Sequence, residues 1–168
     1  AYFWLTLALG VAMILVYMVM ASQFESLVHP FVVMFSLPFA FAGVAWGLYL
    51  RGFALDVIVF LGMLLLIGVV VNNAIVLVDY INILRARGRS MTEAIREAGK
   101  TRLRPVLMTA FTTIFGLVPM AYKSGQGSEV WNPMGTTIVS GLLVGTVVTL
   151  VIIPVMYSIL ETSERPTT

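Results

Sequence analysis

Long apolar stretches alternate with short polar breaks along the whole chain. A helix that crosses the hydrocarbon core of a membrane needs roughly 20 consecutive apolar residues, and several stretches reach that length. These stretches cover residues 2–21, 30–50, 57–84, 103–122 and 132–160. Gly, Ser, Gln and charged residues mark the breaks between them. The pattern predicts an all-α, polytopic membrane protein in which residues 1–168 form a transmembrane domain of five helices.

The segment 85–102, between the third and fourth stretches, carries most of the positive charge. Seven of the ten Lys and Arg residues lie within residues 85–104. Basic residues accumulate on the cytoplasmic side of a membrane, so this loop is predicted to be cytoplasmic, with the tail 161–168 on the same side. The letters S-M-T-E from Ser90 are typical of a helix start, and we expect a short surface helix that ends near Gly99.

The tryptophans give a separate check on this orientation. Trp4, Trp46 and Trp131 all fall at the helix ends that face away from the basic loop. Indole rings concentrate at membrane interfaces, where an apolar ring and a polar N–H are both accommodated. The loops at Arg51 and Lys123 are therefore predicted to face outward.

Composition supports a membrane protein and excludes several classes of function. Hydrophobic residues make up 60% of the chain and charged residues 11%, with a mean hydropathy of +0.99. Soluble domains carry about a quarter charged residues. Because the chain has no Cys and His29 is its one histidine, we expect no metal site and no cofactor. The net charge of +2 is too small to indicate nucleic acid as a partner.

Two further expectations concern enzymes and completeness. Ser124, Ser128 and Ser140 are candidate nucleophiles, but His29 lies at the opposite face and no acidic pair occupies adjacent spans, so an enzyme is not expected. The chain begins at Ala1 inside an apolar stretch, without an initiator Met. We therefore expect a partial transmembrane domain, cut from a longer polypeptide.

Two adjacent amides, Asn72 and Asn73, interrupt the third apolar stretch near its middle. An amide in hydrocarbon costs several kcal/mol without a hydrogen-bond partner, so both must face protein or water. Spacings of four and seven residues return to one face of a helix, which places Gly68, Asn72 and Asp79 on a common stripe. Asp79 falls close to the cytoplasmic boundary, and we expect it to pair with Arg85 or Arg102.

The fourth stretch adds hydroxyl groups at a similar depth. Thr109, Thr112 and Thr113 reach about the level of the two amides, counting from the cytoplasmic side. Helices joined by a short loop pack as neighbours, so amides and hydroxyls are predicted to form a polar seam. Such a seam is typical of an ion or proton path, although bonding between helices, or from each Thr to a carbonyl of its own helix, would explain it as well.

Several motifs resemble a known family of transporters. They are G-V-V-V-N-N-A-I-V-L-V-D-Y, L-R-A-R-G-R-S-M-T-E-A-I, T-R-L-R-P-V-L-M-T-A, I-F-G-L-V-P-M-A, M-G-T-T-I-V-S-G-L-L-V-G-T and P-V-M-Y. In this order they are similar to the last five transmembrane helices of resistance-nodulation-division (RND) efflux pumps, in the branch that exports hydrophobes and amphiphiles more than in the heavy-metal branch. The resemblance covers nearly the whole chain.

The resemblance implies a proton-driven efflux pump in the bacterial inner membrane. Its protomer would have twelve helices and two large periplasmic insertions, and this chain would supply helices eight to twelve. The resemblance further implies a homotrimer that joins a periplasmic adaptor and an outer-membrane channel. Protons would enter at acidic residues of the fourth helix, which lies in the remainder of the polypeptide.

Residues of the family's proton relay can be matched one by one. The position of Asn72 is a lysine in well-known members, where it faces two aspartates of the fourth helix. Asn73 matches an asparagine of the family, and Arg102 and Thr109 match an arginine and a threonine implicated in the relay. Because an amide cannot neutralise carboxylates as a lysine does, the resemblance implies fewer ionised acids opposite Asn72. Asp79, Thr112 and Thr113 would support the seam.

One alternative from another class is a helical membrane scaffold that transports nothing, or an accessory of protein translocation with related topology. Such a protein would lack a second six-helix half and the periplasmic insertions.

Overall fold

The computed structural model describes the backbone of residues 2–163, which is helical apart from short connections. Taking α2 and α3 together, five of its helical segments are long and apolar enough to cross a membrane. The predicted all-α membrane fold with five spans is therefore confirmed. The helices of this range are α1 (Tyr2–Phe24), α2 (Val28–Met34), α3 (Leu37–Arg51), α4 (Val57–Ala86), α5 (Met91–Ala121) and α6 (Ser128–Ser163).

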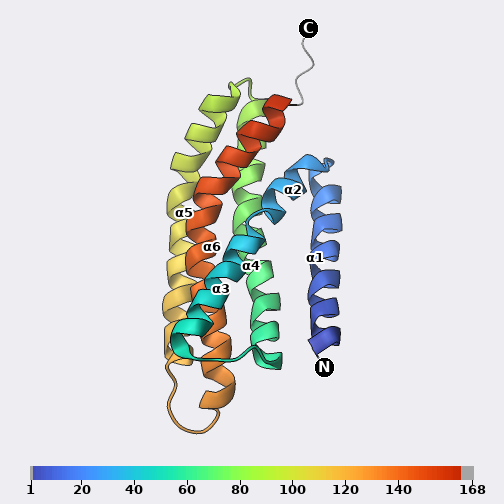
Figure 1. Cartoon of the computed structure of the whole chain (residues 1–168). Helices are drawn as coiled ribbons and strands as arrows, with labels where there is room; N and C mark the ends of the chain where they lie inside the picture. The colour runs from blue at the N-terminus through green and yellow to red at the C-terminus, as the bar shows by residue number, and fades with distance from the viewer. Residues whose placement is uncertain (1, 164–168) are drawn as a thin grey trace.

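α6 is the central helix of the bundle. It packs against α3, α4 and α5, whereas α1 contacts only α2 and α4 among the described helices. Successive spans run in opposite directions, so the start of α5 lies at the end of the bundle opposite to the N-terminus (Figure 1). Figure 1 also shows α1 standing at the edge of the bundle.

The second span is broken, where the sequence predicts one continuous helix over 30–50. α2 ends at Met34 and α3 starts at Leu37. Pro38 lies in the first turn of α3, where its missing N–H costs no helical hydrogen bond. The hydroxyl of Ser36 donates to Val33 O at 2.7 Å, which satisfies one carbonyl at the break. The proline and this local bond explain why the span divides here.

The fourth span is longer than the sequence predicts, because the expected surface helix and the span are one helix. α5 runs without interruption from Met91 to Ala121. Gly99 does not adopt a positive φ and so does not end the helix. A glycine inside a helix costs only about 1 kcal/mol relative to alanine, which is too little to break a long helix. The predicted start is confirmed, since Ser90 Oγ accepts from Glu93 N at 3.3 Å.

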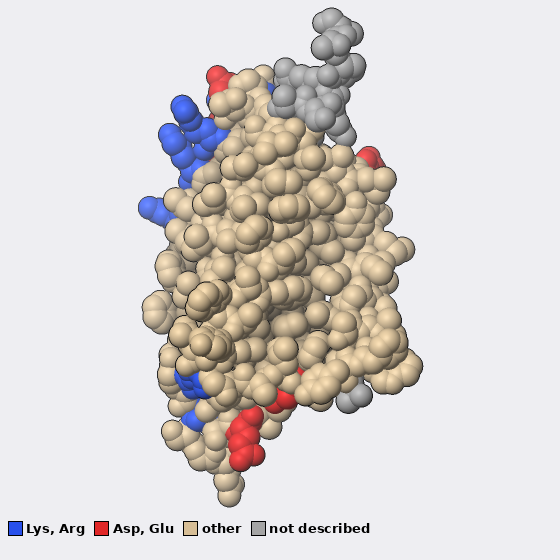
Figure 2. Space-filling model, in the orientation of Figure 1, with Lys and Arg blue, Asp and Glu red and all other residues tan. Residues whose placement is uncertain are grey.

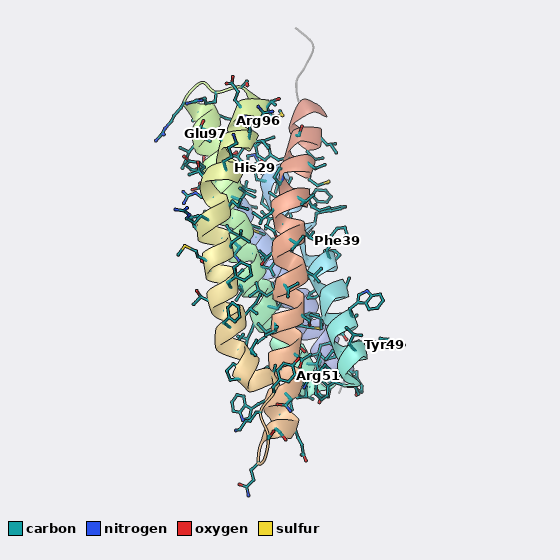
Figure 3. The ribbon with its side chains drawn as sticks, turned by 90° about the vertical axis from the view of Figure 1, so that its left-hand side faces the viewer. His29, Phe39, Tyr49, Arg51, Arg96 and Glu97 are labelled. Carbon is teal, nitrogen blue, oxygen red and sulfur yellow. The ribbon has the colours of Figure 1, made fainter. Side chains whose placement is uncertain are left out.

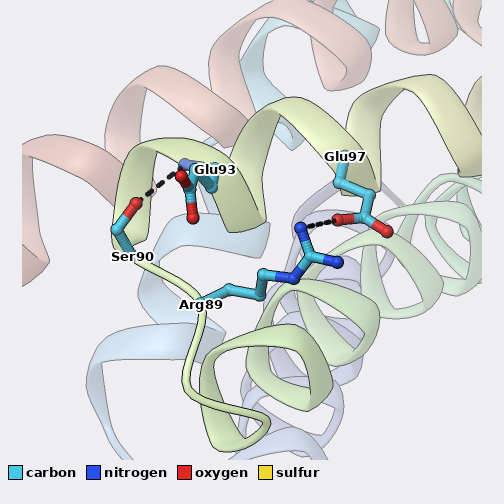
Figure 4. Close-up of polar contacts among 4 residues, drawn as sticks. All are labelled: Arg89, Ser90, Glu93 and Glu97. Atoms are coloured by element: carbon cyan, nitrogen blue, oxygen red, sulfur yellow. Dashed lines mark hydrogen bonds and ion pairs between the residues drawn. The ribbon is translucent and has the colours of Figure 1, made fainter.

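An ion pair also fixes the connection before α5. Arg89 Nη1 lies 3.0 Å from Glu97 Oε2, one to two turns into the helix (Figure 4). Both side chains are partly exposed, so the pair contributes at most about 1 kcal/mol.

A constant register joins α4 and α6, which run parallel (Figure 1). Four of the contacts link residues 75 positions apart in the sequence, as the hydrogen bond between Tyr157 and Asn82 does. Most of the pairs set a small residue against a larger one, which lets the two backbones approach closely. The pairs are Gly62–Thr137, Leu66–Gly141, Val70–Gly145 and Asn82–Tyr157.

The crossing of α3 and α6 is equally close. A methyl group added at Gly43 would lie 2.6 Å from Val144 Cβ and 2.9 Å from the carbonyl oxygen of Ser140. At Gly47 it would overlap the side chain of Ser140. Since the carbonyl belongs to the backbone of α6, no rotation of a side chain can relieve the first contact.

A polar cluster ties the basic end of the bundle together. Tyr157 is 1% exposed, and its hydroxyl donates to Asn82 Oδ1 at 2.6 Å. Arg85 Nη1 donates to the same hydroxyl at 3.2 Å. The ring of His29, labelled in Figure 3, stacks on Tyr157 with a centroid distance of 5.5 Å. The cluster therefore joins α2, α4 and α6 at one depth.

We expect Gly43→Ala to destabilise the protein by about 1–3 kcal/mol, because overpacking at α3 and α6 forces the helices apart. The measurement is thermal unfolding of the detergent-purified full-length protein. Gly99→Ala is the matched control: a methyl group there meets no atom within 4 Å, so stability should hold or rise. Equal stability of both variants would contradict the close crossing.

Candidate functional site

The predicted stripe on α4 forms an exposed face of the bundle. Gly68, Asn72 and Asp79 are all exposed, and the face extends to Leu61 and Leu65. None of the described helices covers it. An amide at the middle of a span is thus presented outward, toward whatever packs against α4 in the membrane.

The second amide points the opposite way. Asn73 is 5% exposed, and its Nδ2 has no hydrogen-bond partner within the described chain. The hydroxyls of Thr146 and Thr149 on α6 are likewise buried and without partners there. The register of 75 residues sets Thr146 level with Val71 and Thr149 level with Ala74 (146 − 75 = 71; 149 − 75 = 74). Asn73 and these two hydroxyls are therefore three buried polar groups at about one depth.

These two threonines were missed in the sequence, where only the hydroxyls of the fourth stretch stood out. The motif G-T-V-V-T, which begins at Gly145, could have indicated them. It places two hydroxyls three residues apart on the side of α6 that carries the close-packed glycines.

The threonines of α5 bond mainly to their own helix. Thr109 Oγ1 donates to Pro105 O at 2.9 Å, and Thr113 Oγ1 donates to Thr109 O at 2.9 Å. For Thr109 and Thr113, the alternative that each hydroxyl bonds to a carbonyl of its own helix is thus correct. Thr109 and Thr112 are exposed, whereas Thr113 is half-buried.

The depth of Thr109 follows from a contact nearer the basic end. Arg102 on α5 lies over the ring of Tyr80 on α4, 4.5 Å from its centroid. α4 and α5 are antiparallel, so moving seven residues away from the basic end leads from Arg102 to Thr109 on α5 and from Tyr80 to Asn73 on α4 (102 + 7 = 109; 80 − 7 = 73). Thr109 and Asn73 therefore lie at about the same depth. The predicted common depth of amides and hydroxyls agrees with this geometry.

Arg102 is half-buried, and its Nε is buried without a hydrogen-bond partner in the described part of the chain. Its stacking on Tyr80 holds the guanidinium between α4 and α5. The expected pairing of Asp79 is wrong: among the described side chains of residues 2–160, Asp79 forms no ion pair. Asp79 lies on the exposed stripe, whereas Arg102 meets the side of α4 that carries Tyr80, and Arg85 turns toward Tyr157.

The described side chains at mid-span supply hydrogen-bond donors and acceptors. Amides and hydroxyls occupy the middle of α4, α5 and α6, and the nearest carboxylate on α4, Asp79, stands about 10 Å along the axis from Asn72. The described residues contain no group of three His, Cys, Asp or Glu side chains that could hold a metal ion.

Comparison with known proteins identifies the family. A sequence model described as the AcrB/AcrD/AcrF family matches residues 4–161. The swarming motility protein SwrC of Bacillus subtilis is 45% identical over 157 residues, which covers 93% of this chain and 15% of the relative. The cobalt-zinc-cadmium resistance protein CzcA of Cupriavidus metallidurans is 37% identical over 161 residues, which covers 96% of this chain and 15% of the relative.

A solved structure of a heavy metal efflux pump matches with a TM-score of 0.84 and 34% identity, covering 94% of this chain and 15% of that one. The similar proteins thus include pumps named for heavy metals, and the match is not specific to the branch that exports hydrophobes and amphiphiles. The chain spans about 15% of the length of these relatives. With a family model matching almost its whole length, the chain belongs to the AcrB/AcrD/AcrF family of RND transporters, which are multi-pass membrane proteins and not enzymes.

Proposed function

We propose that this chain is part of a proton-driven RND efflux pump and forms one wall of its transmembrane proton relay. The observation that carries the proposal is the exposed amide of Asn72 halfway along α4, on a face that no described helix covers. A polar group at this depth requires a polar partner, because hydrocarbon offers none. The partner would come from the remainder of the polypeptide.

The partner that fits best is a titrating carboxyl group. An amide has two N–H donors and a carbonyl acceptor, so it bonds a carboxylate as well as a protonated carboxyl. Asn72 can therefore stay bonded while the acid gains and loses a proton. With no positive charge at this position, a single ionised acid opposite α4 is easier to accommodate than two.

The other residues have supporting roles. Asn73 and Thr109, at one depth, would orient water or side chains along the seam, and Thr112 and Thr113 extend it by one turn. Arg102, held against Tyr80, would stabilise negative charge toward the basic end, with Asp79 at the margin.

An apolar groove supports amphiphiles as the cargo. It lies between α1 and the α2–α3 pair and has a volume of about 620 Å³. Apart from the Tyr17 hydroxyl, which already donates to Leu27 O, the lining side chains offer no oxygen or nitrogen ligands to divalent cations, whereas they suit an amphiphile that enters from the membrane. The lining residues include Met13, Ile14, Phe31, Leu37 and Phe41.

The complete pump would work as a homotrimer in the bacterial cytoplasmic membrane, joined to an adaptor and an outer-membrane channel. The end of the bundle with the start of α5 would face the cytoplasm. Lys and Arg side chains gather over that end in Figure 2, and Trp4, Trp46 and Trp131 belong to helix segments at the opposite end.

Orientation is tested by single cysteines at Arg89 and Ser124, labelled from outside in intact cells that express the full-length protein. The basic loop should be protected, so only the cysteine at Ser124 should react. Labelling at Arg89 alone would invert the proposed topology.

Asn72→Lys tests the relay in the full-length pump. A fixed positive charge beside a single acid would hold that acid ionised, and a relay that cannot reprotonate cannot cycle. We expect loss of drug resistance in a pump-deleted host, with normal protein levels and trimer formation.

Asn72→Gln is the matched control, because it keeps the amide and should keep most resistance. Asn72→Ala should impair export less than Asn72→Lys, and Asn73→Ala and Thr109→Ala should impair it if the seam conducts protons. Full resistance with Asn72→Lys would remove Asn72 from the relay and leave the seam a packing feature.

Cargo is tested with the same host and the wild-type pump. Expression should raise resistance to amphiphilic dyes and detergents at least tenfold more than resistance to cobalt, zinc or cadmium, since an apolar groove discriminates against hydrated cations. Survival on dye and on metal plates is the measurement. Metal resistance without dye resistance would assign the pump to the heavy-metal branch.

A further inference from the structure

A groove lies between α5 and α6 at the basic end of the bundle. It has a volume of about 370 Å³, and its walls differ in chemistry. The α5 wall carries Thr92 and Arg96, which are four residues apart and so neighbours on one helix face. The α6 wall is largely apolar, with Pro154, Val155 and Ile159. We refer to it as the α5–α6 groove.

Positive charge continues along α5 from Arg96, the one cation that lines this groove among the described residues. Arg96, Lys100 and Arg104 follow each other at four-residue intervals along α5, and all three are exposed. None of them forms an ion pair with another described side chain of residues 2–160, whereas Arg89 is paired with Glu97. Figure 2 shows the cations gathered over the start of α5, and Figure 3 labels Arg96 at this end. Two acids, Glu93 and Glu97, lie on the same turns, and Glu97 is already paired with Arg89, so positive charge prevails among the described side chains.

The lengths and compositions of the candidate spans would set the groove at the depth where a membrane changes from acyl chains to headgroups. Its α6 wall occupies the last turns of the candidate span Ser128–Leu160, level with the polar cluster around Tyr157. Arg96 lies in the first two turns of α5, beyond the long apolar part of that helix. The cation is thus on the water side of the groove and the apolar wall on the hydrocarbon side.

We propose that the α5–α6 groove binds one anionic phospholipid of the leaflet that meets the basic end of the bundle. The phosphate is held by the Arg96 guanidinium and the Thr92 hydroxyl, and an acyl chain lies along Pro154, Val155 and Ile159. The site goes beyond the proposed proton relay and depends on neither the direction of transport nor the cargo.

The chemistry of both walls selects this ligand. Guanidinium binds phosphate oxygens through paired N–H donors, and three cations at one interface favour a lipid with net negative charge over a zwitterionic one. A soluble anion would leave the apolar wall unused. An apolar chain alone would leave Arg96 without an anion.

The test is native mass spectrometry of the detergent-purified full-length protein, titrated with phosphatidylglycerol or with phosphatidylcholine of identical chains. Wild type should bind phosphatidylglycerol more tightly than phosphatidylcholine. Arg96→Ala should weaken phosphatidylglycerol binding about fivefold, the effect expected for one interfacial cation. Arg87→Ala removes the same charge at the same end, outside the groove, and should change binding less than twofold.

A second pair of variants tests the apolar wall without changing charge. Val155→Trp fills the groove and should weaken binding, whereas Val147→Trp, on an exposed position about 12 Å away along α6, should not. Equal losses from Arg96→Ala and Arg87→Ala would reduce the effect to general surface charge and overturn the site. Unchanged binding in Val155→Trp, or full displacement by soluble glycerol phosphate, would overturn it as well.

Discussion

Close packing of α6 against three neighbouring helices is the interaction on which the rest of the bundle depends. In a membrane, lipid chains are as apolar as Leu or Val, so burial of apolar surface gives helices little reason to associate. Dispersion contacts between closely approached backbones must supply the attraction. Small residues at Gly43, Gly47, Gly141 and Gly145 permit that approach, and the constant register along α4 holds it over several turns.

Because of this packing, the adjacent amides of Asn72 and Asn73 point in opposite directions. The side of α4 locked to α6 carries Asn73 inward, level with the hydroxyls of Thr146 and Thr149, and leaves Asn72 on the open face. An inward amide contributes to specific pairing of helices, whereas an outward one recognises what lies beyond. Adjacent positions therefore differ in their proposed roles: Asn73 supports the seam from inside the bundle, and Asn72 meets the titrating acid.

The number of spans and the stripe of Asn72 were predictable, because length, hydropathy and helical spacing are properties of single segments. Features that depend on the contact between two segments were not predictable from the sequence. Asp79 lacks its expected arginine because Arg102 meets Tyr80 and Arg85 meets Tyr157, and no spacing within one helix encodes that choice. The continuous α5 escaped prediction for a different reason: a glycine inside a helix resembles a glycine that ends one, and only the backbone angle of Gly99 separates the two.

The same contacts indicate which parts of the bundle can move. α3, α4, α5 and α6 share close crossings, so a displacement within this group must break backbone-level contacts. α1 contacts only α2 and α4 among the described helices, and the break at Ser36 separates α2 from α3. Rearrangement of α1 and α2 therefore costs fewer contacts than rearrangement within α3–α6. Since the apolar groove lies between α1 and the α2–α3 pair, this movable boundary coincides with the surface proposed to admit cargo, while the amides of α4 stay on the rigid side.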